Sequence, residues 1–487
     1  MNPARVVFPV IRWRERELEA VWAEARSAVE LGVGGFVVFG GRVSGMAKLV
    51  ARANQHAGRP LLFAADLERG AGQQFSEATP LPPPAALAGL DDSALIEAAR
   101  MTAQEAASAG IGWVLGPVAD LDIEPANPIV GTRSFGSGAL SVADQVRGWI
   151  LALQGEGVHA CAKHFPGHGR TTADSHAELP VVDASRDELD ADLTPFRAAI
   201  DVGVRSIMMA HVAYPAFDPS GRPASLSYAL VGLLRRRLGF GGLVVTDAMI
   251  MEAVSALGYT PAQASVEAIR VGCDVVLYPP SPEATVVALN EALSDGTLSE
   301  DRLASAIRRI QAAAEQAQLP PDDMVPTPSY DQALDMAAAA VCQLRGSMPV
   351  LHPGDRTRLL VVDDDRESTP ATGAGPGTTA VDRGALARAL TERGVEVLGE
   401  DDRRPATELI AAFADVRGWK GRAGLASSTA ARLARLLDRE LDATLVLFGH
   451  PRLADRFPSA ARVLCGWNGD PLMQEAVAER LVRSVDE

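Results

Sequence analysis

The stretch from Lys163 to Pro180 carries more side chains capable of acid–base chemistry than any other part of the chain. It reads KHFPGHGRTTADSHAELP and places three histidines, a lysine and an aspartate within eighteen residues. It follows the apolar run 157–162, which predicts a buried strand that delivers Lys163 and His164 to the mouth of a core. The glycine and threonine residues beyond Pro166 predict a long loop.

Asp174 and His176 stand two residues apart in that loop, so both side chains emerge on one side if the backbone is locally extended. A buried carboxylate beside an imidazole raises its pKa and fixes its tautomer, which allows the imidazole to act first as an acid and then as a base. Taken singly, each histidine could be a hydrogen-bonded core residue, and the DSH triplet could cap a helix. However, five of the eight histidines lie between residues 159 and 211, and structural roles do not require such clustering.

The run K-H-F-P-G-H-G-x-T-x-x-D-S-H-x-x-L-P resembles, almost letter for letter, the signature loop of the bacterial β-N-acetylglucosaminidases of glycoside hydrolase family 3. The resemblance implies a TIM barrel in which His176, paired with Asp174, is the acid/base on a mobile loop. It also implies that Lys163 and His164 bind the sugar at a strand end.

A glycosidase needs a second group, usually a carboxylate on the other side of the sugar ring. Asp247 is the best candidate, because it ends the apolar run LVVTD and is followed by AMIM. Family members carry an aspartate nucleophile after a strand of this kind. The resemblance therefore implies that Asp247 forms a covalent glycosyl-enzyme intermediate and that the anomeric configuration is retained. A helix N-cap is the alternative interpretation of Asp247.

Three further segments resemble substrate-binding parts of the family. The first, LGPVADLDIEPANPIVGTRSFG, implies that Asp120 and Arg133 are site residues, and arginine is suited to bind sugar hydroxyls or an acetamido oxygen. The other two, MMAHVAYPAFD at 208–218 and PASLS at 223–227, resemble the region of the sixth strand and imply that His211 lies near the site, whereas Met208 and Met209 are expected in the core.

One segment departs from the family pattern D-x-E-G-G-x-V-x-R. Here Asp66 is kept, Arg69 replaces a glycine and Gln74 stands where the later arginine is expected. The resemblance implies that Asp66 binds sugar hydroxyls, while the two changes leave the aglycone side and the exact sugar open.

The elements that must position these residues alternate between short apolar runs and helical patterns. Continuous apolar runs predict strands buried on both faces, as in a parallel sheet. Eight such runs, each followed by a helical segment, predict a closed (β/α)8 TIM barrel, whose chemistry belongs at the carboxyl ends of the strands. Asp66, Asp120, Lys163, His164, His211 and Asp247 all stand at such ends. The predicted strands are 5–10, 34–40, 59–66, 111–120, 157–164, 204–211, 242–249 and 273–279.

A second domain is predicted after the barrel. We place the barrel at residues 1–318, a Pro-rich acidic linker at 319–330 and a smaller α/β sandwich-type domain at 331–487. The last domain again alternates strands and helices. Its predicted strands are 358–365, 394–399, 443–451 and 461–469, with a helix at 384–393.

Length and composition narrow the classes of function. The 487 residues suit a barrel plus a second domain, and the net charge of −16 argues against nucleic acid or an anionic membrane as the main partner. Four widely spaced cysteines fit reduced, structural thiols. The first twenty residues lack a secretory apolar core, so a cytoplasmic location is expected. No cofactor or metal is expected.

The sequence thus predicts a retaining exo-β-N-acetylglucosaminidase that removes terminal GlcNAc from small glycosides, such as peptidoglycan turnover fragments, as a monomer or homodimer. An imidazole does not repel an incoming anion, so a β-N-acetylglucosaminide or β-glucoside phosphorylase with the same site is the alternative. A metal-dependent barrel hydrolase and a non-catalytic sugar-binding protein are weaker alternatives, because HxH and HExxH motifs are absent and the acid/base pair is intact.

Overall fold

The computed structural model describes residues 2–13, 16–175, 177–317, 329–364, 382–416 and 420–483. The packing of the chain divides it into two compact units. Unit 1 consists of Met1–Thr79, Leu95–Glu124 and Gly136–Pro328; unit 2 consists of Pro80–Ala94, Pro125–Phe135 and Ser329–Glu487. The predicted linker 319–330 lies outside the described residues, apart from Ser329 and Tyr330.

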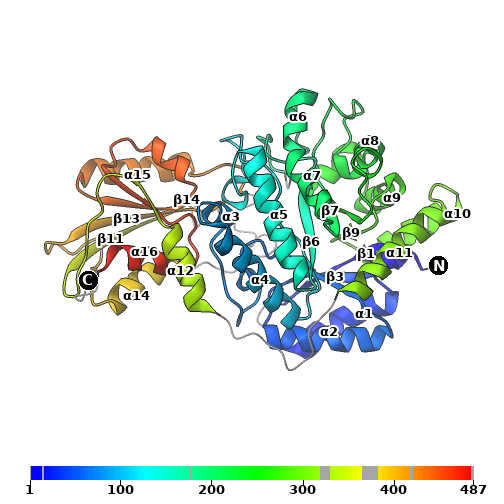
Figure 1. Ribbon diagram of the computed structural model, residues 1–487, viewed down its shortest axis with the longest axis horizontal. Coiled ribbons are helices and arrows are strands. Elements are labelled where there is room, and N and C mark those ends of the chain that lie inside the picture. Colours follow the sequence, from blue (N-terminus) through cyan, green and yellow to red (C-terminus); the bar gives the residue numbers. More distant parts are fainter. Residues whose placement is uncertain are drawn as a thin grey trace. The chain divides into compact units, whose positions relative to one another are not determined.

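Unit 1 is built on a curled parallel sheet of seven strands, and each strand is hydrogen-bonded to the next in chain order (Figure 1). Most residues of these strands are apolar and buried, as expected for strands covered on both faces; the polar exceptions include Arg12 of β2 and His159, Lys163 and His164 of β6. In order across the sheet they are β2 (Val10–Arg12), β3 (Gly35–Phe39), β4 (Leu62–Ala65), β5 (Trp113–Val114), β6 (His159–Phe165), β7 (Ser206–Met209) and β8 (Leu243–Thr246).

A second parallel pair in unit 1 joins β1 (Val7–Phe8) to β9 (Val276–Leu277). The sequence predicted one strand at 5–10, but the structure has two short strands, β1 and β2, with Pro9 between them. Proline interrupts the strand because it cannot donate a backbone hydrogen bond. The Pro9 carbonyl still accepts from the Val37 amide at 2.9 Å. A parallel bridge between Val245 and Val275 connects β8 with the start of β9.

Large aromatic side chains fill the interior of unit 1. The rings of Phe8 on β1 and Trp113 on β5 meet edge to face, with their centroids 5.9 Å apart. The Trp113 indole donates to the Ser206 hydroxyl on β7 at 2.8 Å, so its buried N–H is satisfied. Phe36 and Phe63 stack on neighbouring strands with centroids 5.4 Å apart. Side chains of strands far apart in the sequence therefore share one core.

Helices follow the strands of unit 1 and surround the sheet in Figure 1. Their ends carry ordinary sequence signals: Thr260 and Gln263 form a capping box, and Gly32, with φ of 96°, adopts the left-handed conformation that ends its helix. The longer helices are α1 (Leu18–Leu31), α2 (Val43–Ala57), α4 (Asp92–Ser108), α5 (Ala139–Gly155), α7 (Thr194–Asp201), α9 (Pro261–Val271), α10 (Pro282–Ser294) and α11 (Glu300–Gln316).

Unit 2 contains a six-stranded sheet in which the edge strand β10 is antiparallel and the other five strands are parallel. A predicted α/β domain is confirmed, but β10 and the central strand β13 were not predicted. In order across the sheet the strands are β10 (Cys342–Arg345), β15 (Arg462–Cys465), β14 (Thr444–Gly449), β13 (Thr407–Ala414), β11 (Arg356–Asp363) and β12 (Glu396–Leu398).

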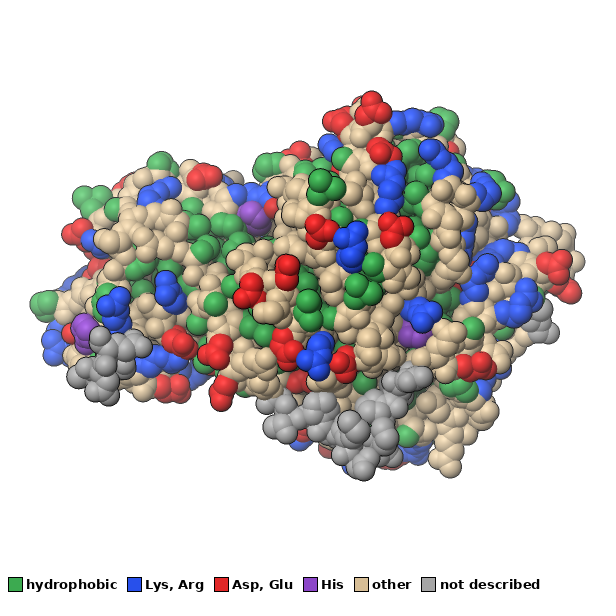
Figure 2. All heavy atoms as spheres, in the orientation of Figure 1, with side chains coloured by type: hydrophobic (Ala, Val, Ile, Leu, Met, Phe, Trp, Pro, Cys, Tyr) green, Lys and Arg blue, Asp and Glu red, His purple; other side chains and the backbone are tan. Residues whose placement is uncertain are grey.

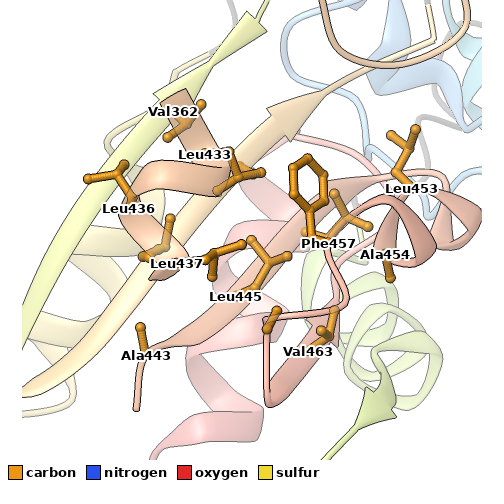
Figure 3. Packing of buried hydrophobic residues seen from close by; sticks show 14 of the residues in the cluster. Val362, Leu433, Leu436, Leu437, Ala443, Leu445, Leu453, Ala454, Phe457 and Val463 are labelled. Carbon is orange, nitrogen blue, oxygen red and sulfur yellow. The ribbon is translucent and has the colours of Figure 1, made fainter. Parts of the chain in front are cut away.

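Helices cover both faces of this sheet. In Figure 1, α15 (Ser427–Arg439) lies on one face, and α14 (Ala385–Glu392) and α16 (Pro471–Leu481) lie on the other. Figure 3 shows Leu433, Leu436 and Leu437 of α15 packed against Leu445 on the sheet, within one buried apolar cluster. Burial on both faces accounts for the apolar sequences of the inner strands.

The surface carries charged side chains, and the four cysteines are thiols rather than a disulfide framework, as the composition predicted. Acidic and basic side chains are interspersed on the face shown in Figure 2. Cys161, Cys273 and Cys465 are buried, whereas Cys342 is half-buried and pairs in register with Cys465 across β10 and β15. None of the helices in the described part of the chain is both long and apolar enough to cross a membrane.

Candidate active site

The carboxyl ends of the unit 1 strands bring several predicted site residues to one edge of the sheet. Lys163 and His164 lie near the end of β6, whose seven residues are all buried. Asp66 directly follows β4, Asp247 directly follows β8 and His211 lies two residues beyond β7. Carboxyl ends of parallel strands meet at the same edge, where barrel enzymes carry their chemistry.

Lys163 is held between two carboxylates. Its Nζ lies 2.7 Å from Asp66 Oδ1 and 2.7 Å from Glu68 Oε1. The side chains of Lys163 and Glu68 are 3 % and 7 % exposed, whereas 29 % of the Asp66 side chain is exposed. The ion pairs therefore fix Asp66 in place while leaving part of its carboxylate open to a ligand.

Asp120 ties the end of β6 to the loop that follows it. Its Oδ2 lies 2.7 Å from Nδ1 of His164, and its Oδ1 accepts from the amides of His164 at 3.1 Å and His168 at 2.7 Å. Burial raises the pKa of Asp120, but the neighbouring His164 and the His168 amide outweigh burial, so the pKa lies below its usual value. The ionised Asp120 therefore orients the imidazole of His164 and binds the backbone of the following loop.

His168 is a neutral, structural histidine. Burial first, and the neighbouring His164 second, lower the pKa of His168 to about 4. Its Nδ1 lies 2.8 Å from the Thr171 hydroxyl, and its Nε2 lies 3.3 Å from the Ser175 hydroxyl. These bonds on both ring nitrogens stiffen the loop around residues 168–175.

The same loop approaches other parts of unit 1 closely. A Cβ on Gly169 would lie 1.9 Å from the Leu121 carbonyl oxygen, so no larger side chain fits there. Arg170 Nε pairs with Asp192 Oδ2 at 2.7 Å. The Ser175 carbonyl accepts from the Ala253 amide at 3.4 Å, which links the loop to the segment beyond β8.

The predicted acid/base dyad falls at the end of this loop. Asp174 is buried, 3 % exposed, and its backbone carbonyl accepts from the amides of Ala177 at 2.9 Å and Glu178 at 3.1 Å. His176 lies outside the described residues. The pairing of His176 with Asp174 therefore stays a prediction.

Asp247 is half-buried at the carboxyl end of β8. Its amide donates to the Met209 carbonyl on β7 at 3.2 Å, and its Oδ1 accepts from the Ala248 amide at 2.7 Å. The next helical segment begins only at Glu252, so Asp247 does not occupy the position of a helix N-cap. Its carboxylate is fixed by backbone on one oxygen and remains partly accessible to solvent.

His211 and Arg133 have different surroundings. His211 is fully buried, and its Nδ1 lies 2.7 Å from the Ser225 hydroxyl. Arg133 belongs to unit 2, where its Nη1 donates to the Ile129 carbonyl at 2.8 Å. Met208 and Met209 are buried, as expected.

The edge of the sheet is rich in carboxyl groups relative to cations. Asp66 and Glu68 flank Lys163, while Asp120 follows β5 and Asp247 follows β8 of the same sheet. An excess of negative charge in a partly water-excluded site stabilises positive charge that develops in a transition state. An oxocarbenium-like sugar is such a species.

Residues 12–313 match the family model described as the glycosyl hydrolase family 3 N terminal domain. The chain belongs to glycoside hydrolase family 3. This match spans well over half of the chain and includes every unit 1 residue placed above at the candidate site. The family-3 protein is a glycoside hydrolase.

Relatives named for related activities resemble most of this family-3 chain. A "Beta-N-acetylglucosaminidase/beta-glucosidase" from Cellulomonas fimi is 32% identical over 391 residues, covering 75% of this chain and 69% of that protein. A β-N-acetylglucosaminidase structure from Paenibacillus sp. str. FPU-7 superposes with a TM-score of 0.81 at 24% identity, covering 99% of this chain and 95% of that one. A "Beta-glucoside phosphorylase" structure gives a TM-score of 0.84 at 22% identity, covering 99% and 91%.

Of the two residues that depart from the family pattern, Gln74 uses its side chain to bind backbone, whereas Arg69 contributes its backbone amide. Oε1 of Gln74 accepts from the Gly40 amide at 3.3 Å, and the Arg69 amide donates to the Gln73 side chain at 3.1 Å. Glu68, which binds Lys163, was not singled out from the sequence. Its position two residues after Asp66 is the signal that could have indicated it, because alternate residues of an extended segment face the same side.

Proposed function

We propose that this glycoside hydrolase is a retaining exo-β-N-acetylglucosaminidase that releases terminal GlcNAc from small soluble glycosides, such as fragments from peptidoglycan turnover. The observation that carries the proposal is the half-buried Asp247 at the same sheet edge as the Lys163–Asp66 ion pair. The names of the Cellulomonas and Paenibacillus relatives support GlcNAc as the sugar.

In this proposal Asp247 is the nucleophile. Its carboxylate attacks the anomeric carbon while the imidazolium of His176, paired with Asp174, gives its proton to the leaving oxygen. Neutral His176 then removes a proton from water, which attacks the same carbon and releases Asp247. Two displacements at one carbon retain the anomeric configuration.

The remaining predicted residues bind the sugar. Asp66 and Lys163 hydrogen-bond to hydroxyl groups, and the ion pair between them keeps both side chains in place. His164, oriented by Asp120, presents its second ring nitrogen to a hydroxyl. We retain His211 as a proposed part of the site wall; the role of Arg133 toward the acetamido group stays a prediction from the sequence.

We also propose that the sheet of unit 1 closes into a (β/α)8 TIM barrel. The parallel bridge Val245–Val275 joins β8 to the β9 segment, and β9 pairs with β1, which continues directly into β2. The contact between Phe8 and Trp113 supports closure, because side chains from opposite sides of an eight-stranded barrel meet in its interior.

A phosphorylase is the second candidate. Its support is the likeness to the β-glucoside phosphorylase structure together with an imidazole, rather than a carboxylate, as the proposed base. Phosphate would then replace water in the second displacement and the product would be a sugar 1-phosphate. Both reactions use Asp247 and His176 in the same way.

The test measures nitrophenol release from the 4-nitrophenyl β-glycosides of GlcNAc and glucose. Wild type, Asp247→Ala and His176→Ala are compared in phosphate-free buffer and with added phosphate. We expect a preference for GlcNAc, loss of turnover in Asp247→Ala and a strong decrease in His176→Ala. Asp295→Ala, which changes an exposed aspartate beyond α10, serves as the matched control.

Separate outcomes sort the alternatives. Phosphate-dependent turnover with a sugar 1-phosphate product would replace the hydrolase by the phosphorylase. Activity lost with a chelator would indicate a metal hydrolase, and a folded wild type that is inactive on both sugars would leave a sugar-binding protein. Full activity in Asp247→Ala would remove the proposed mechanism.

A further inference from the structure

An arginine and two aromatic rings occupy the carboxyl edge of unit 1 apart from the groups already described. Arg12 is the last residue of β2, Phe39 is the last residue of β3 and Tyr278 directly follows β9. All three side chains are half-buried. None of the three belongs to the residues proposed above for catalysis or sugar binding.

The strand register places this cluster between Asp66 and Asp247. Arg12 is the register partner of Phe39, and the β3–β4 register, Val37 with Ala64, brings Phe39 level with Asp66. Two strand spacings, about 10 Å, therefore separate the backbones of Arg12 and Asp66.

The other side of the cluster adjoins β8. The Met249 amide, two residues beyond Asp247, donates to the Leu277 carbonyl at 3.0 Å. Tyr278 follows Leu277, and its amide donates to the Phe8 carbonyl at 2.9 Å. In the closed barrel proposed above, Arg12, Phe39 and Tyr278 thus lie on the part of the edge between Asp247 and Asp66.

Arg12 is held by aromatic groups rather than by an acid. Its Cζ lies 5.3 Å from the ring centroid of Phe39 and 5.1 Å from that of Tyr278, and its guanidinium donates to the Tyr278 hydroxyl. Among the described residues, no aspartate or glutamate forms an ion pair with Arg12. A guanidinium carries five N–H donors, and the bond to the Tyr278 hydroxyl uses one of them.

Tyr278 adopts a backbone conformation that tyrosine rarely takes. Its φ is 49°, in the left-handed region, which is unfavourable for a residue with a large side chain. Residues held in such conformations cluster at binding sites, where the position of the side chain outweighs the cost. Here the conformation places the phenol against Arg12.

We propose that Arg12, supported by Phe39 and Tyr278, binds an oxyanion beside the sugar in the proposed glycosidase site. The position beside a bound sugar rests on the proposed function, whereas the binding of an oxyanion by Arg12 does not. Arginine binds carboxylates and phosphate through paired N–H groups, and the aromatic rings exclude water and keep the guanidinium in place. The oxyanion has two possible sources: a carboxylate on the glycoside itself, or inorganic phosphate that enters as acceptor.

Kinetics distinguish the two sources. Wild type, Arg12→Gln and Tyr278→Phe are assayed on the 4-nitrophenyl and the 3-carboxy-4-nitrophenyl β-glycosides of the preferred sugar, with and without phosphate. If the glycoside supplies the anion, Arg12→Gln should lower kcat/KM for the carboxylated substrate about 10- to 100-fold more than for the neutral one. If phosphate supplies it, the variant should raise the phosphate concentration needed for half-maximal turnover by a similar factor.

A second measurement does not depend on turnover. We expect phosphate or glucuronate to raise the melting temperature of wild type above that in sodium chloride of equal ionic strength, and Arg12→Gln to lose this shift. Arg52→Gln is the matched control, because Arg52 also stacks on an aromatic ring, Trp22, but pairs with Glu19 on the surface. Tyr278→Phe should show an intermediate effect in both measurements.

Equal loss on both substrates, with no change in phosphate dependence and no anion-dependent melting shift in wild type, would overturn the inference and leave Arg12 a structural residue. A wild type inactive on every glycoside but stabilised by the anions would instead overturn the proposed function and keep the anion site.

Discussion

The two ends of the unit 1 sheet use buried charge in opposite ways. At the carboxyl end, Lys163 is shared by Asp66 and Glu68, and Asp66 remains partly exposed. At the amino end, Asp274 precedes β9 and is completely buried. It pairs with three arginines, at 2.9 Å from Arg302 and 3.1 Å from Arg309, and in close contact with Arg235.

The two ends differ in whether positive or negative side chains are in excess, and in whether a carboxylate is exposed to solvent. Three cations neutralise one carboxylate at the amino end, and the amide of Val244 donates to the same carboxylate at 3.1 Å. That arrangement fastens α11 and the segment of Arg235 to the sheet. Carboxyl groups are in excess at the carboxyl end, where 29 % of the Asp66 side chain is exposed and Asp247 is half-buried. Buried ion pairs alone therefore do not indicate an active site.

The largest effect should come from Lys163→Met. Removal of the cation leaves Asp66 and Glu68 side by side, so we expect kcat/KM per folded molecule to fall about 10²- to 10³-fold, as for other preorganised charged groups. Steady-state kinetics with circular dichroism check this. Lys48→Met, which changes an exposed lysine on α2, is the control, and equal activity of both variants would contradict the assigned role.

Asp274→Asn should affect stability instead. The change leaves three arginines without their carboxylate, and we expect the free energy of unfolding to fall by about 3 kcal/mol. Urea unfolding measures the loss, and kcat/KM at low temperature should stay at the wild-type value. A variant as stable as the protein with Asp295→Asn would show that the network contributes nothing.

Acid should weaken the amino end through His159, the first residue of β6. Burial, and then Arg205, lower the pKa of His159 to about 4 from 6.5. The unfolded chain takes up a proton below about pH 6.5 whereas the folded protein does not, so stability falls as the pH decreases from 6.5 towards 4. At about pH 5 the loss is about 2 kcal/mol for this residue.

Urea unfolding of wild type and His159→Gln at pH 7 and at pH 5 isolates this contribution. The neutral His168, whose pKa is also about 4, remains in the variant, so about half of the acid-induced loss from the two histidines should persist. Identical pH dependence in both proteins would contradict the assignment of His159.

Tyr214→Phe should have the smallest effect and should act at the carboxyl end. The buried Tyr214 hydroxyl donates to the carbonyl of Gly167, in the loop beyond β6, at 2.8 Å. Loss of the bond should cost about 1 kcal/mol of stability and lower kcat a few-fold, because the loop that carries Asp174 loses an anchor. Tyr228→Phe, at an exposed position, should change neither quantity.

The sequence predicted the strands of unit 1 well, because burial on both faces demands continuous apolar runs and loops follow each of them. It failed at β13, whose sequence TELIAAFA is rich in good helix formers. Its place in the middle of the unit 2 sheet, between β11 and β14, overrides that propensity. Tertiary context of this kind has no signal in a short window of residues.

The candidate site shows the same limit. The series of predicted parallel strands, each ending in polar residues, predicted that Asp66, Lys163, His164 and Asp247 share one edge, and the topology places them at these strand ends. Their catalytic and binding roles, and that of His176, stay predictions. Arg12 was not singled out, because its surroundings come from Tyr278, 266 positions further along the chain.

The contacts of the loop beyond β6 predict how its residues vary among homologous proteins. A side chain at position 169 would collide with the Leu121 carbonyl, so selection should remove any substitution of Gly169. Arg170 pairs with Asp192, and these two positions can change together. Among homologous chains that keep this loop, position 169 should therefore be invariant. Position 170 should covary with position 192, so that a lineage that loses the arginine also loses the aspartate.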